Sequence, residues 1–176
     1  MKRTIASWLA FGAVSTCWAI TGHISWATSA ALAGEVRAGS GSPLEVARIG
    51  ARPAVEGGAE NFTGKVTVEA RFQQPSPARV GGATVAFQPG ARTAWHTHPL
   101  GQTLIVMDGV GWVQREGAPK QTIRRGDVVV IPPNARHWHG AAADSRMTHV
   151  AVAESLDGNV VTWMEQVTEA QYLSDS

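Results

Sequence analysis

Short β-type runs separated by glycine and proline fill the chain from residue 65 to residue 164. The runs are rich in valine, threonine and isoleucine, and several alternate apolar with polar side chains, which is typical of strands. Strands at this close spacing predict an all-β sandwich or barrel. The predicted strands are Lys65–Arg71, Ala83–Phe87, Thr93–His98, Thr103–Met107, Gly111–Arg115, Gln121–Arg124, Asp127–Ile131, His137–Ala141, Met147–Glu154 and Val160–Met164.

Turn and cap signals separate these elements. Asp108-Gly109 lies between two apolar runs and predicts a tight hairpin turn, and Gly117-Ala118-Pro119 predicts a second hairpin. Thr168, followed three residues later by Gln171, forms a capping box that predicts a short C-terminal helical turn. No internal repeat is visible, so residues 61–176 are expected to form a single domain.

Residues 1–33 have the layout of a secretory signal peptide. Lys2 and Arg3 precede a mostly apolar stretch, and small residues follow up to Ala33, after which we expect cleavage. A membrane anchor is the competing interpretation, but serine, threonine and histidine interrupt the stretch before it reaches the ~20 apolar residues of a span. A lipid anchor at Cys17 is the weaker alternative. The sequence therefore predicts a periplasmic or secreted protein with no stable membrane span in its mature form.

Residues 34–60 are rich in glycine, alanine and proline without a sustained period, which predicts a flexible N-terminal arm. The whole chain has 15 lysine and arginine residues against 14 aspartate and glutamate residues, a net charge of +1. Because the positive and negative charges nearly balance, there is no electrostatic reason to expect a nucleic-acid partner. Cys17 is the only cysteine and lies in the predicted leader, so no disulfide or thiol is expected to act in the mature domain.

All histidines after the predicted leader lie between residues 96 and 149. Side chains alternate faces along a strand, so His96 and His98 point the same way. Gln102 follows a Pro-Leu-Gly bend that returns its amide oxygen toward the same point, and His137 arrives from a distant strand. Three imidazoles and one carbonyl oxygen predict a divalent-ion site with open coordination positions, as catalysis requires. The competing interpretation is a set of core histidines in a metal-free barrel.

The spacing of these residues resembles the two motifs of the cupins. The first motif is matched at Gly90, His96, His98, Gln102 and Gly109, and the second at Gly126, Pro132, Asn134 and His137. Three departures are Gln102 for the usual glutamate, Asn134 for glycine and Ala141 for asparagine. The resemblance implies a double-stranded β-helix, or jelly-roll barrel. A neutral glutamine should bind the ion less tightly than a carboxylate and leave it a stronger Lewis acid.

His139 and His149 remain outside this ligand set. His139 shares the face of His137, and His149 lies on the following strand. Neutral imidazole exchanges protons near pH 7, so either residue is a candidate general base. The alternatives are that each is a hydrogen-bonded barrel histidine, or that His139 orients a ligand.

The tryptophans are assigned structural roles. Trp95 and Trp138 alternate with the candidate ligands and are expected to pack outside the barrel. Trp112 and Trp163 are expected in its core.

Three segments closely resemble small bacterial cupins with (R)-selective hydroxynitrile lyase activity: residues 89–104, His137-Trp138-His139-Gly140 and Met147-Thr148-His149. The resemblance covers about residues 61–173. It implies Mn²⁺ on the four candidate ligands, with His139 and His149 beside the substrate as catalytic residues. Fe²⁺, Zn²⁺ or another divalent ion stays open as an alternative. The implied reaction is the cleavage and formation of cyanohydrins such as mandelonitrile, a carbon–carbon lyase reaction that releases an aldehyde and hydrogen cyanide.

The same resemblance places Ala83, Val85 and Ala153 at the substrate pocket, where small side chains leave room for an aromatic ring. Ala153 departs from a polar residue in the relatives. Barrels of this size commonly pair through an N-terminal strand, so a homo-oligomer, dimer or tetramer, is expected. Two other functions stay open: an oxygenase or decarboxylase-associated enzyme acting on a small molecule, and a noncatalytic cupin that binds one.

Overall fold

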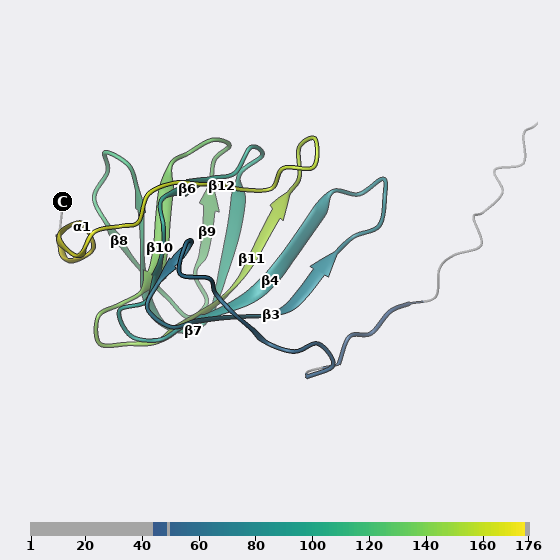
Figure 1. The fold of residues 1–176 in the computed structure, drawn as a ribbon, viewed down its shortest axis with the longest axis horizontal. Helices are drawn as coiled ribbons and strands as arrows, with labels where there is room; N and C mark the ends of the chain where they lie inside the picture. Colours follow the sequence, from purple (N-terminus) through teal and green to yellow (C-terminus); the bar gives the residue numbers. More distant parts are fainter. Residues whose placement is uncertain (1–43, 49, 175–176) are drawn as a thin grey trace, which may run out of the picture. The chain divides into compact units, whose positions relative to one another are not determined.

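The computed structural model describes residues 44–48 and 50–174, so the predicted signal peptide lies outside the described residues. These residues belong to one compact unit, in which strands curl around an interior and a short helix lies at one side (Figure 1). The elements are β1 (Val55–Glu56), β2 (Phe62–Thr63), β3 (Val66–Gln73), β4 (Val80–Phe87), β5 (Arg92–Thr93), β6 (His96–Thr97), β7 (Gln102–Arg115), β8 (Gln121–Arg124), β9 (Val128–Ile131), β10 (His137–Ala141), β11 (Met147–Glu154), β12 (Thr162–Trp163) and α1 (Glu169–Leu173).

The predicted all-β architecture is confirmed by the strand pairing. The strands are hydrogen-bonded in the order β1-β3-β4-β11-β7-β10-β5-β2. β6 pairs with β10 and β12 pairs with β6, while β8 and β9 both pair with β7. The sheet is therefore a curled half-barrel whose inner face encloses the site.

The course of β7 corrects the sequence prediction. Two strands with a tight turn at Asp108-Gly109 were expected, but β7 is continuous through this point. Gly109 has a φ of 76°, and a side chain there would collide with the backbone of Arg146, so this position requires glycine. The β7–β11 register shifts between Thr148 and His149, and such a bulge bends a strand without reversing it. As a result, the first half of β7 pairs with β9 and β11, and the second half pairs with β8 and β10.

Other elements match the sequence predictions. The bounds of β8, β10 and β11 are as predicted, and β7 and β8 form the hairpin predicted at residues 117–119. Thr168 is the N-cap of α1 and forms the capping box with Gln171. Asn134 has a φ of 58°, the left-handed conformation that asparagine tolerates.

Two predicted segments differ in the structure. The strand expected at Thr93–His98 is divided into β5 and β6. The expected arm, residues 34–60, contributes β1, whose Val55 and Glu56 lie opposite Val68 and Thr67 of β3. β1 is a strand because it pairs with β3, and the composition of residues 34–60 does not reveal this pairing.

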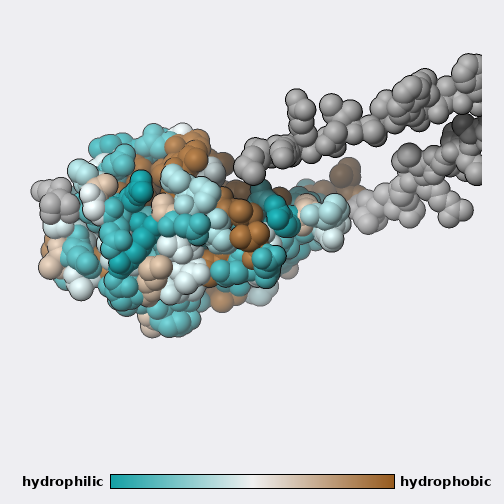
Figure 2. Space-filling model, turned by 90° about the horizontal axis from the view of Figure 1, so that it is seen from above, coloured by the Kyte–Doolittle hydropathy of each residue, from teal (hydrophilic) through white to brown (hydrophobic). Residues whose placement is uncertain are grey.

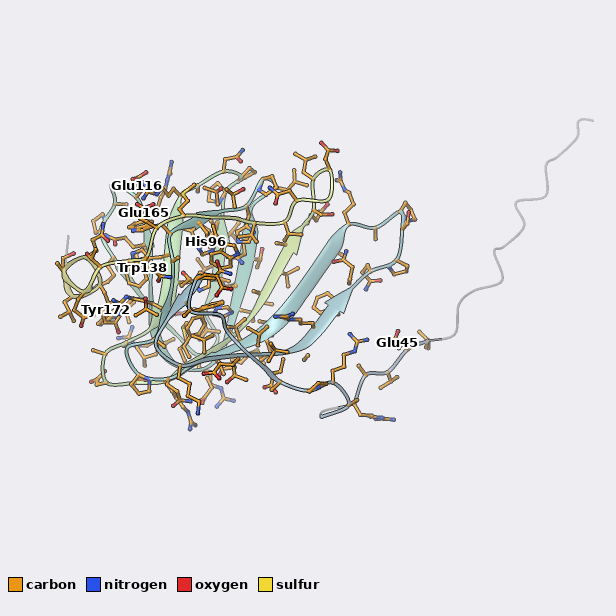
Figure 3. All side chains as sticks on the ribbon, in the orientation of Figure 1. Glu45, His96, Glu116, Trp138, Glu165 and Tyr172 are labelled. Carbon is orange, nitrogen blue, oxygen red and sulfur yellow. The ribbon has the colours of Figure 1, made fainter. Side chains whose placement is uncertain are left out.

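An outer aromatic cluster, which we define as Trp95, Trp112, Trp138 and Tyr172, joins α1 to the sheet. Figure 3 shows Trp138 and Tyr172 together near α1. The Tyr172 hydroxyl donates to the carbonyl of Ala141 at 2.8 Å. Trp95 and Trp138 were predicted to pack outside the barrel, and in the structure they form a cluster with Val167 and Tyr172 of the C-terminal segment.

The surface seen from above is mostly hydrophilic, with separate apolar groups (Figure 2). Exposed large apolar side chains of the described residues include Val128 and Val130 of β9. Within residues 44–48 and 50–174, no helix has both the length and the apolar character needed to cross a membrane.

Candidate active site

A pocket of about 510 Å³ lies against the inner face of the sheet. Five of the six predicted metal-binding and catalytic residues line it: His96, His98, Gln102, His139 and His149. The sixth, His137, contacts this group because its Nε2 lies 3.3 Å from Gln102 Oε1. The structure thus brings all six side chains together, and each is buried.

Three of the imidazoles are oriented by the main chain. In each, Nδ1 lies within hydrogen-bond distance of a carbonyl oxygen: His96 with Ala94 (2.9 Å), His98 with Val160 (2.7 Å) and His137 with Ala135 (2.9 Å). A carbonyl can only accept, so Nδ1 must carry the proton and the lone pair must lie on Nε2. Metal-binding histidines are typically held in this way.

The same three rings lie close together. Ring centroids are 4.1 Å apart for His96 and His137, 5.2 Å for His96 and His98, and 5.8 Å for His98 and His137. His98 Nε2 is buried without a hydrogen-bond partner. Figure 3 shows His96 inside the curled sheet. The Nε2 lone pairs of these three imidazoles and the Gln102 carbonyl oxygen are suitable ligands for a divalent ion.

A second, overlapping group could also hold an ion. Ligand atoms of His96, His137 and His139 all lie within 4.8 Å of one another. The two groups differ in whether His98 or His139 supplies the third imidazole.

His139 and His149 form a hydrogen-bonded pair, with His149 Nε2 3.2 Å from His139 Nδ1. Their other nitrogens, His139 Nε2 and His149 Nδ1, are buried without a partner. When both rings are neutral, one of them donates the shared proton and the other accepts it. It follows that one outer nitrogen has a lone pair and the other has a proton. The pair therefore always offers one acceptor and one donor.

Burial keeps these imidazoles neutral at pH 7. It lowers the pKa of His137 and that of His149 to about 4. Burial also lowers the pKa of His98, and it lowers the pKa of His96 and of His139 well below the usual value. For His96 and His139, a second cause is repulsion from a neighbouring imidazole, His137 and His149 respectively. Neutral imidazoles are the form that binds metal and accepts protons.

Aromatic side chains form one wall of the pocket, and sequence reasoning placed none of these three, Phe62, Phe87 and Trp163, at the site. Trp163 lies 4.8 Å from the His96 ring and 5.6 Å from Phe62, and all three line the pocket together with Phe87. Trp163 had been expected in the core, but it pairs with His96 in the β12–β6 register. No local pattern signals this position, because a long-range pairing creates it.

The predicted substrate-pocket residues are only partly at the pocket. Val85 lines it, opposite His149 in the β4–β11 register. Among the described lining residues, Ala151 appears, and Ala83 and Ala153 do not. Ala83 packs against the apolar core, and Ala153 lies farther along β11, opposite Gln102 of β7.

Comparisons with known proteins agree with this geometry. A family model described as a cupin domain matches residues 83–153. Over 129 residues the chain is 56% identical to a protein named (R)-mandelonitrile lyase from Granulicella tundricola, covering 73% of this chain and 98% of that protein.

Solved structures show the same fold. A cupin-like protein from Thermotoga maritima is 40% identical with a TM-score of 0.63, covering 66% of this chain and 89% of that one. A cupin-2 domain from Rhodospirillum rubrum is 18% identical with a TM-score of 0.52, covering 68% of this chain and 76% of that one, and it supports the fold alone.

Proposed function

The chain belongs to the cupin family, among cupins of the mandelonitrile lyase type, and from this premise we propose that it is a metal-dependent lyase that cleaves and forms cyanohydrins. One observation carries the proposal. Three imidazoles donate Nδ1–H to main-chain carbonyls and so carry their lone pair on Nε2, beside a pocket that also holds the His139–His149 pair. The 56% identity to a protein named (R)-mandelonitrile lyase supports the same class of reaction.

We assign the ion to His96, His98, Gln102 and His137. His98 is preferred to His139 because its Nδ1 contacts a carbonyl, which can only accept, so its buried Nε2 must carry the lone pair. The proton shared by His139 and His149 can lie on either ring, so the tautomer of His139 is not fixed in this way. Three imidazoles and a carbonyl oxygen suit several divalent ions, of which we propose Mn²⁺, with Fe²⁺ and Zn²⁺ as the alternatives. The ion would supply Lewis-acid chemistry that lowers the proton affinity of the substrate's hydroxyl oxygen.

The histidine pair moves the proton. We assign the acceptor to His149 Nδ1, which makes His139 Nε2 a donor to the substrate. His149 takes the hydroxyl proton of the cyanohydrin, the carbon–carbon bond breaks, and the electron pair leaves with cyanide. Burial disfavours the charged imidazolium, so His149 passes the proton to cyanide. The products are an aldehyde and hydrogen cyanide.

The apolar wall of Phe62, Phe87 and Trp163 suits an aromatic or other apolar substituent on the substrate. Mandelonitrile, which carries a phenyl ring, is therefore the first substrate to test.

Cleavage of mandelonitrile by purified, manganese-loaded protein under anaerobic conditions tests the proposal. Wild type should release benzaldehyde without oxygen, and His149→Ala should be strongly impaired with its metal content unchanged. Tyr172→Phe, which alters only the outer aromatic cluster, is the control and should retain activity. A requirement for oxygen would favour an oxygenase, and equal rates for wild type and His149→Ala would remove the base assignment.

We further propose that residues 1–33 direct export to the periplasm or beyond, and that residues 61–176 act as a single cupin domain. Assembly into a dimer or tetramer is part of the same proposal. The N-terminal sequence of the exported protein tests the first of these proposals, and its mass in solution tests the assembly.

A further inference from the structure

A five-residue segment joins the two ends of the curled sheet. β1 stands at one end of the strand order and β2 at the other, and residues 57–61 are all that connects them. We call residues 57–61 the strap. Figure 1 shows this part of the chain, in dark blue, leaving the edge of β3 and passing in front of the sheet. A half-barrel is therefore closed on this side by a segment with no strand structure of its own.

The strap forms part of the pocket wall. Gly57, Gly58, Glu60 and Asn61 line the pocket, and so does Phe62, which follows directly. Ala59 and Glu60 in its middle are exposed to solvent on their other side. A segment that borders both the pocket and solvent is a route between them.

The ends of the strap are held by neighbouring main chain. Gly57 donates to the carbonyl of Val66 at 2.9 Å, and the carbonyl of Asn61 accepts from Ala94 at 2.8 Å. These bonds fix where the strap begins and ends. They do not reach its middle.

The middle of the strap is bound by one side chain from the C-terminal segment. Gln166 Nε2 donates to the carbonyls of Ala59 and Glu60, both at 3.0 Å. Gln166 Oε1 in turn accepts from the hydroxyl of Thr63 at 2.8 Å, which fixes the orientation of the amide. These three hydrogen bonds of the amide thus all go to the strap and its continuation.

We propose that Gln166 is a positioning residue that holds the strap closed over the pocket and so controls passage between the pocket and solvent. The free energy of local opening is lowest for a segment with few buried apolar contacts. The middle of the strap is such a segment, because Ala59 and Glu60 are exposed. Loss of the two bonds from Gln166 frees the strap's middle while its ends stay attached. The passing molecule is the cyanohydrin or its products, and this identification rests on the proposed function.

The test uses metal-free full-length protein and two rates that do not depend on lyase activity. The first is hydrogen exchange at the amides of Asn61 and Phe62, which both donate to the carbonyl of Gly58 inside the strap. The second is the rate at which diethyl pyrocarbonate modifies His149, which lines the pocket and has no exposed surface, measured by peptide mass spectrometry. Together they report strap opening and access to the pocket.

Three variants separate the strap from general loosening of the fold. Gln166→Ala removes the amide, and Gln166→Glu keeps its size and the acceptor for Thr63 but removes both donors. Gln171→Ala is the matched control, because this amide also lies in the C-terminal segment but bonds Thr168 in the helix cap.

Both Gln166 variants should raise the exchange rate and the modification rate at least fivefold, and Gln171→Ala should leave both within twofold of wild type. Unchanged modification of His149 in Gln166→Ala would overturn the proposal, as would an equal increase in Gln171→Ala. In the manganese-loaded protein, Gln166→Ala should change KM for mandelonitrile at least threefold and kcat less than twofold. Failure of wild type to cleave mandelonitrile would contradict the proposed function alone, since the two metal-free rates still decide the role of Gln166.

Discussion

The polar atoms on the two faces of β10 differ in whether they have hydrogen-bond partners. On the outer face, Trp138 Nε1 donates to Gln114 Oε1 at 2.8 Å, and the carbonyl of Ala141 accepts from Tyr172. On the inner face, His139 Nε2 is buried without a partner. An unpaired buried polar atom costs roughly 1–3 kcal/mol, so the inner face keeps a cost that a bound ligand would remove.

The contrast extends to the surrounding residues. Among described residues, five buried side-chain nitrogen atoms have no partner, and three belong to His98, His139 and His149. Trp95 Nε1 is an exception in the outer aromatic cluster. The same strands thus hold the fold together with one face and present free nitrogens to the pocket with the other.

Among the changes that test this comparison, removal of a ligand imidazole should have the largest effect on metal binding and activity. His137→Ala should lower bound metal to less than a tenth of wild type and lower kcat/KM roughly 10³-fold, because Lewis-acid stabilisation is worth several kcal/mol. Metal analysis and mandelonitrile cleavage measure the two effects. His139→Ala is the matched control and should keep its metal. Metal lost from His139→Ala but retained by His98→Ala would place the ion on the alternative group of His96, His137 and His139.

Removal of the proposed base should act on the reaction and not on the metal. His149→Ala should lower kcat roughly 10²- to 10⁴-fold, the usual contribution of a general base, with metal content unchanged. Steady-state cleavage of mandelonitrile and metal analysis of the same sample measure this. A kcat within threefold of wild type would show that His149 is a packing histidine.

Acid should destabilise the inner face of the metal-free protein. Burial lowers the pKa of His137 and of His149 from 6.5 to about 4. Between pH 6.5 and pH 4, these two histidines therefore bind protons in the unfolded chain and not in the folded chain. The stability present above pH 6.5 is therefore lost as the pH falls toward 4, by about 3 kcal/mol for each histidine. Urea unfolding at a series of pH values measures it.

The outer face offers a control for this pH dependence. Burial raises the pKa of Tyr172 to about 12, so the tyrosine does not titrate between pH 4 and pH 7. Tyr172→Phe should therefore shift stability by the same amount at each pH, whereas His149→Asn should reduce the slope. A metal-free wild type with equal stability at both ends of this range would contradict the burial argument.

The smallest effect is expected on the outer face itself. Tyr172→Phe removes the hydrogen bond to the carbonyl of Ala141 and should lower the free energy of unfolding by about 1 kcal/mol. Urea unfolding at pH 7 measures the loss. Mandelonitrile cleavage should be unchanged, and a large loss of activity would mean that the outer aromatic cluster positions the inner face.

Local patterns predicted the parts of the molecule that depend on neighbours in sequence. The bounds of β10 and β11 follow from runs of β-type residues, and the capping box at Thr168 follows from a fixed spacing. The positive φ at Asn134 agrees with its place in the second motif, where glycine is usual and asparagine tolerates the left-handed conformation. The failure at Asp108-Gly109 is instructive, since the same dipeptide suits both a tight turn and a bend within a continuous strand.

The candidate site was predictable in its residues and not in its arrangement. Alternation along a strand placed His96 and His98 on one face, but the position of Trp163 beside His96 required the pairing of β12 with β6. The resemblance placed Ala83 and Ala153 at the pocket, but neither is among its described lining residues.

The sequence by itself determined which side chains share a face, because the backbone geometry of a strand repeats every two residues. Only the tertiary structure decided which faces meet, how far along each strand the pocket extends, and that residues 57–61 join the two ends of the sheet. Those features depend on hydrogen bonds between segments up to about a hundred residues apart, such as the bonds from Gln166 to Ala59 and Glu60, which no local pattern encodes.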